Sequence, residues 1–68
     1  MYEQYIVEME NSGLAKECTD SLQEAELWFD VFTTGLRVSN DQETNVFFKK
    51  LVPGTGNYQT IKARYEIK

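Results

Sequence analysis

The chain has 68 residues, 41% of them apolar and 13% aromatic, and its eleven acids and seven bases give a net charge of −4. This apolar content excludes a disordered tail, and no apolar run approaches the roughly 20 residues that span a bilayer, so no membrane partner is expected. Without histidine, Ser-His-Asp and Cys-His catalytic arrangements are impossible, and the single cysteine excludes an internal disulfide or a Cys/His zinc site.

The length predicts a single domain over residues 1–68. Residues 1–11 lack a basic segment followed by a long apolar run, so no secretory signal is expected. One unpaired cysteine is typical of a reducing compartment, which makes the cytoplasm the expected location.

The first part of the chain predicts a hairpin. Residues 2–10 alternate, with Tyr5, Val7 and Met9 on one side, which indicates a strand with one buried face. Residues 11–13 have the composition of a turn, and residues 14–18 are expected to return as a shorter second strand.

A helix is predicted over residues 22–34. Ser21 and Glu24 have the spacing of a capping box, in which the serine hydroxyl accepts the amide of Glu24 and the carboxylate accepts the amide of Ser21. Gly35 is placed to end the helix in the left-handed conformation. The spacing predicts a buried stripe of Leu22, Ala25, Phe29 and Phe32.

The last third predicts a second hairpin. Residues 36–38 are assigned to the start of a strand, residues 44–52 are rich in strand formers, and residues 53–57 have the composition of a turn. Residues 58–68 alternate, with Ile61, Ala63, Tyr65 and Ile67 expected inward and Thr60, Lys62, Arg64 and Glu66 outward. The predicted fold class is therefore α+β, ββαββ, with one helix packed on a small antiparallel sheet made of two hairpins.

No pattern in the chain indicates catalysis. Cys18 is interpreted as a small buried hydrophobic residue rather than an activated thiolate. Glu24, Glu26 and Asp30 are interpreted as a solvated helix face rather than a catalytic carboxylate pair. The turn at 53–57 lacks the GK[ST] ending of a phosphate-binding loop. We expect no enzyme, no catalytic residue, no metal site and no cofactor.

The charges are distributed unevenly along the chain. Residues 1–30 hold eight acids and one base, a net −7, whereas residues 31–68 hold three acids and six bases, a net +3. Three readings are open: the two halves neutralise each other across the fold, the charge serves solubility alone, or the acidic half attracts a basic partner. The expected partner-binding carboxylates belong to the first hairpin and the helix: Glu8, Glu10, Glu17, Asp20, Glu24, Glu26 and Asp30.

The preferred hypothesis is a small non-enzymatic interaction protein that inhibits a basic, DNA-binding protein as a nucleic-acid mimic. Carboxylates one helical turn apart, about 5.4 Å, can imitate a phosphate backbone. Small acidic proteins without catalytic residues, phage-encoded ones included, are often inhibitors, which is an analogy of type alone.

The alternative hypothesis is a nucleic-acid-binding module built on the basic second hairpin. Its cations would hold phosphates while aromatic side chains stack on bases. The acidic pI of about 4.6 argues against direct binding of nucleic acid. The residues concerned are Lys62, Arg64, Lys49 or Lys50, with Phe47 or Tyr58.

Several apolar residues are expected to face outward. Leu27 and Val31 project away from the buried stripe of the helix, Phe47 lies in a run that places apolar groups on both faces of one strand, and Ile6 breaks the polar side of the first strand. On so short a chain this predicts self-association through Leu27, Val31 and Phe47, with a homodimer as the expected state.

Overall fold

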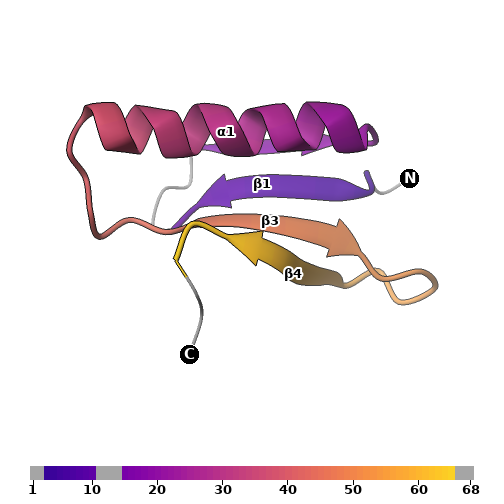
Figure 1. The fold of residues 1–68 in the computed structure, drawn as a ribbon. Coiled ribbons are helices and arrows are strands. Elements are labelled where there is room, and N and C mark those ends of the chain that lie inside the picture. The colour runs from indigo at the N-terminus through magenta and orange to yellow at the C-terminus, as the bar shows by residue number, and fades with distance from the viewer. Residues whose placement is uncertain (1–2, 11–14, 66–68) are drawn as a thin grey trace.

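One helix lies across one face of a four-stranded antiparallel sheet (Figure 1). The computed structural model describes residues 3–10 and 15–65. Its elements in chain order are β1 (Tyr5–Met9), β2 (Lys16–Thr19), α1 (Leu22–Val38), β3 (Val46–Leu51) and β4 (Tyr58–Ala63). The predicted α+β, ββαββ fold with two hairpins is confirmed.

The two hairpins join through their inner strands. The strand order is β2-β1-β3-β4, and Val7 of β1 lies opposite Phe48 of β3. The predicted alternation of β1 is confirmed, because Tyr5 and Val7 are buried on the face beneath the helix. Ile6 and Glu8 therefore lie on the opposite face, which no other described element covers.

The helix begins at the predicted residue with a modified cap. Ser21 is the N-cap, and its hydroxyl accepts the amide of Glu24 at 3.2 Å. The reciprocal half of the capping box does not form. Instead, the Ser21 amide donates to the hydroxyl oxygen of Thr19, and that hydroxyl donates to the carboxylate of Glu24. Thr19 is buried, and these bonds satisfy its side chain.

The helix continues one turn beyond Gly35, so the predicted end and the predicted strand at 36–38 are both wrong. Leu36 lies seven residues after Phe29, so both face the same side of the helix, and both are buried. The burial of Leu36 holds the extra turn against the sheet. Asn40, with a φ of 61°, takes the left-handed position instead. The Asn40 amide donates to the carbonyl of Arg37 and the Asp41 amide to that of Leu36, which completes a Schellman motif.

The core lies between the helix and the three strands it covers. α1 packs on β1, β2 and β3, while β4 lies at the edge of the sheet beyond it (Figure 1). Leu22, predicted in the buried stripe, is 49% exposed, and Phe32 packs against the core from a half-buried position. The buried residues are Tyr5, Val7, Thr19, Ala25, Phe29, Leu36, Val46 and Phe48.

The predicted alternation of the last segment is wrong because β4 contains a bulge. Lys62 lies opposite Phe48 and Thr60 opposite Lys49, which leaves Ile61 as an extra residue. Lys62 therefore faces the helix side, and Ile61 is 52% exposed. The turn predicted at 53–57 is confirmed, with Gly54 and Gly56 at positive φ. The predictions for residues 2, 11–14 and 66–68 lie outside the described residues.

Candidate interaction surfaces

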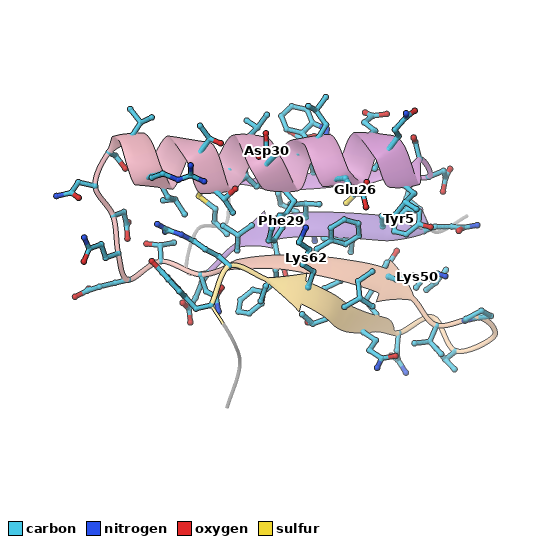
Figure 2. The ribbon with its side chains drawn as sticks, in the orientation of Figure 1. Tyr5, Glu26, Phe29, Asp30, Lys50 and Lys62 are labelled. Atoms are coloured by element: carbon cyan, nitrogen blue, oxygen red, sulfur yellow. The ribbon has the colours of Figure 1, made fainter. Side chains whose placement is uncertain are left out.

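Two carboxylates of the helix lie on the flank above β4. Glu26 and Asp30 are one turn apart on α1, and both are exposed (Figure 2). Neither carboxylate forms an ion pair with any residue in the described ranges 3–10 and 15–65. Within this part of the chain, Glu26 and Asp30 are therefore exposed charges without an ion-pair partner.

Two further carboxylates lie at the start of the helix, and each uses one oxygen locally. Asp20 accepts the amide of Gln4 at 3.0 Å, and Glu24 accepts the hydroxyl of Thr19 at 3.2 Å. Both residues remain exposed. A carboxylate near a helix N-terminus interacts favourably with the helix dipole, which suits both acids to these positions.

Glu17 lies opposite Val7 in the register of β1 and β2, so its side chain shares the face that carries the helix. We define the acidic surface as the five carboxylates of β2, the turn after it and the first half of α1: Glu17, Asp20, Glu24, Glu26 and Asp30. The five are spread over both flanks of the helix, because Glu17 is at the β2 edge of the sheet whereas Glu26 and Asp30 are on the flank above β4.

The two other predicted acids lie apart from the acidic surface. Glu8 is on the uncovered face of the sheet, where the ammonium of Lys49 donates to its carboxylate at 2.5 Å. Glu10 follows the end of β1, near the C-terminal end of the helix, and accepts the amide of Asn45 at 3.3 Å. The structure therefore separates Glu8 and Glu10 from the five acids of the acidic surface.

Most cations of the second hairpin have local partners. The ammonium of Lys62 lies 4.8 Å from the ring centroid of Phe29, and the guanidinium of Arg64 donates to the carbonyls of Asp41 and Thr44. Lys49–Glu8 is the single ion pair among the residues that the structure describes. Ion pairing between the two halves thus leaves the acidic surface unneutralised.

The predicted basic binding face is divided between two sides of the sheet. Lys50 and Lys62 lie opposite Tyr5 and Phe48, so both are on the helix side, as Figure 2 shows. Lys49, already paired with Glu8, is on the uncovered face with half-buried Phe47. The helix side therefore holds Lys50 and Lys62 without Phe47, whereas Lys49 and Phe47 share the uncovered face.

The three predicted self-association residues also divide between two faces. Leu27 and Val31 are 60% and 46% exposed on the outside of α1, as expected. Phe47 lies opposite Glu8 on the uncovered face of the sheet, where it is half-buried. Sequence reasoning missed Val38, which is 83% exposed and continues the line of Leu27 and Val31, because residues 36–38 were assigned to a strand.

Two remaining features carry no chemistry of their own. Cys18 is exposed, which overturns its predicted burial, because it lies opposite Ile6 on the uncovered face. An open hollow is lined by residues 39–44, the loop that the hydrogen bonds of Asp41 hold together. No group of three or more acids, cysteines or histidines within the described ranges could hold a metal ion.

Comparison with protein-family models, with curated proteins and with solved structures finds no match to this chain. Among the described residues, α1 lacks the length and apolar content that a membrane-crossing helix requires.

Proposed function

We propose that this is a small non-enzymatic interaction protein that binds a basic partner through the acidic surface and inhibits that partner by occupying its nucleic-acid site. The observation that carries the proposal is the lack of any ion pair at Glu17, Asp20, Glu24, Glu26 and Asp30 within the described chain, while Lys62 and Arg64 of the second hairpin contact other groups. Unpaired carboxylates attract a cationic surface over about one Debye length, roughly 10 Å at 0.1 M salt.

The shape of the acidic surface supports a nucleic-acid-binding protein as the partner. Glu26 and Asp30 lie one helical turn apart, and Asp20 and Glu24 extend the negative charge around the start of the helix. A groove that binds a phosphate backbone presents lysine and arginine side chains over a similar span. The proposal includes a cytoplasmic location, which the free thiol of Cys18 supports.

The test compares two triple variants with the same change in net charge. Glu17→Gln, Glu24→Gln and Glu26→Gln together remove charge from the acidic surface, and the glutamine at position 24 can still accept the hydroxyl of Thr19. The matched control removes three charges elsewhere: Glu3→Gln, Glu10→Gln and Glu43→Gln. Circular dichroism verifies that both variants are folded.

Each immobilised protein is incubated with a fraction of nucleic-acid-binding proteins from a cell extract. The wild type and the control triple should retain basic proteins at low salt and release them at high salt or on addition of duplex DNA. The acidic-surface triple should lose this capture. Equal retention by both triples would show that these carboxylates only solvate the helix, and capture that DNA does not displace would contradict mimicry.

A further inference from the structure

The outside of α1 carries an apolar stripe that the described chain leaves uncovered. Leu27, Val31 and Val38 follow each other at intervals of four and seven residues, so they lie along one line of the helix. Their side chains are 60%, 46% and 83% exposed. Among the other large apolar residues of the helix, Leu22 alone is also exposed. A stripe of this length is typical of a helix that packs on a second helix.

No contact among the described residues requires a glycine at position 35 of this helix. A Cβ at this position would meet nothing within 4 Å, and its φ is outside the left-handed region that favours glycine. Glycine in a helix interior costs about 1 kcal/mol relative to alanine. On a helix surface, however, it allows a bulky side chain of another molecule to approach the backbone closely.

Asp30 and Arg37 place opposite charges on one flank of the stripe. They are seven residues apart, which separates them by about 10.5 Å along the helix axis, and they form no ion pair with each other. Both side chains are exposed, and neither has an ion-pair partner among the described residues. One acid and one base are thus available at a fixed spacing.

We propose that a second copy of this chain covers the stripe as an antiparallel helix pair around a two-fold axis. With the axis between Val31 and Thr34, Leu27 of each copy faces Val38 of the other. This arrangement buries the exposed apolar side chains of both helices at once.

The same register satisfies the two flanks. In this register, the positions of Asp30 in one copy and Arg37 in the second copy differ by two residues, which is about 3 Å along the helix axis. On the opposite flank, Trp28 comes equally close to the level of Gly35 of the second copy, where no side chain blocks it. Charge complementarity and the exposed glycine therefore both select a second copy in place of an unrelated helix.

The first test measures the dimer dissociation constant of the full chain by sedimentation velocity over a range of concentrations. Leu27→Gln should weaken the dimer more than tenfold, because each dimer loses two buried leucines. The matched control is Ile61→Gln, which changes a similarly exposed residue on β4 and should leave the dissociation constant unchanged. A monomer at every concentration would overturn the proposal.

The second test exchanges the charges of the flank. Asp30→Arg and Arg37→Asp should each weaken the dimer about threefold to tenfold, because each creates like charges across the interface. The double variant has the wild-type net charge and should restore the dissociation constant to within about twofold. Since these side chains do not meet within one chain, restoration requires contact between copies. Failure of the double variant to recover would contradict the antiparallel register.

Gly35→Ala separates helix stability from association. It should raise the melting temperature at concentrations where the chain is monomeric, because alanine favours the helix, and it should weaken the dimer. A higher melting temperature together with a tighter dimer would place Gly35 outside the interface and overturn the proposed register. The purified chain is the only component of these tests, so their outcome is independent of the basic partner.

Discussion

The carboxylate of Asp41 forms hydrogen bonds within the loop after the helix, and its carbonyl links this loop to Arg64 of the second hairpin. Its carboxylate accepts the amides of Glu43 and Thr44 at 2.9 and 2.8 Å and the hydroxyl of Thr44 at 2.6 Å. These hydrogen bonds, the Thr44 hydroxyl first among them, lower the pKa of Asp41 from 3.8 to about 2, and the charge of Arg64 acts in the same direction. Hydrogen bonds that favour the charged form explain the shift.

A pH dependence follows from this lowered pKa. Because the folded pKa lies below the unfolded one, ionised Asp41 contributes stability above pH 3.8, and this contribution is lost as the pH falls toward 2. Thr44→Val removes the hydroxyl and should raise the pKa of Asp41 toward 3.8. NMR titration of the carboxyl carbon measures it, with Thr33→Val as control because the Thr33 hydroxyl bonds only backbone carbonyls. An unchanged titration in Thr44→Val would assign the shift to the amides alone.

Single residues of β2 show where sequence reasoning reaches its limit. The segment contains no clear alternation, and hydrophobicity favoured burial of Cys18. The register with β1 instead places Thr19 opposite buried Tyr5, so the threonine is in the core and the cysteine is exposed. Composition alone could not set the phase of a four-residue strand, because only its pairing with a distant strand determines which side faces the helix.

At the level of elements, the start of α1 was predictable and its end was not. The N-terminal signal is local, since Ser21 and Glu24 are three residues apart and act on each other directly. By conformational preference the sequence indicated Gly35 as the end of the helix, whereas the structure has Asn40 in the left-handed position. Burial of Leu36 against the sheet decided between them, which is a tertiary effect that no local window contains.

The N-cap gives a prediction for the stability of this element. Ser21→Ala removes the acceptor of the Glu24 amide and should lower the free energy of unfolding by about 1 kcal/mol. Urea denaturation followed by circular dichroism measures the change. Ser21→Asp, which keeps an oxygen acceptor at the cap, should retain most of the stability. An unchanged stability in Ser21→Ala would mean that the bonds of Thr19, rather than the serine hydroxyl, cap the helix.

At the scale of the whole molecule, the covering of the sheet predicts unequal stability. α1 packs over β1, β2 and β3 but not over β4. Amides of β1 and β3 should therefore exchange with solvent only on global unfolding, whereas those of β4 should exchange faster through local opening. Hydrogen exchange measured by NMR tests this directly. Equal protection in β3 and β4 would contradict it.

The candidate surfaces depended on this same non-local arrangement. Counting charges along the chain grouped Glu8 with the helix acids, but the pairing of β1 with β3 brings it to Lys49, 41 residues away. Five of the seven predicted acids are nevertheless neighbours along the chain, because they belong to the consecutive elements β2 and α1 and the turn between them. Strand order, and with it the face on which a strand residue lies, required the structure.

The extra residue in β4 bears on how copies of this protein behave when crowded together. β4 is an edge strand, and a regular edge offers its free backbone groups as a template on which further chains add and filaments grow. The bulge at Ile61 breaks that template near its middle, and Lys62 places a cation beside it. The irregularity that defeated the predicted alternation is thus a safeguard against open-ended aggregation.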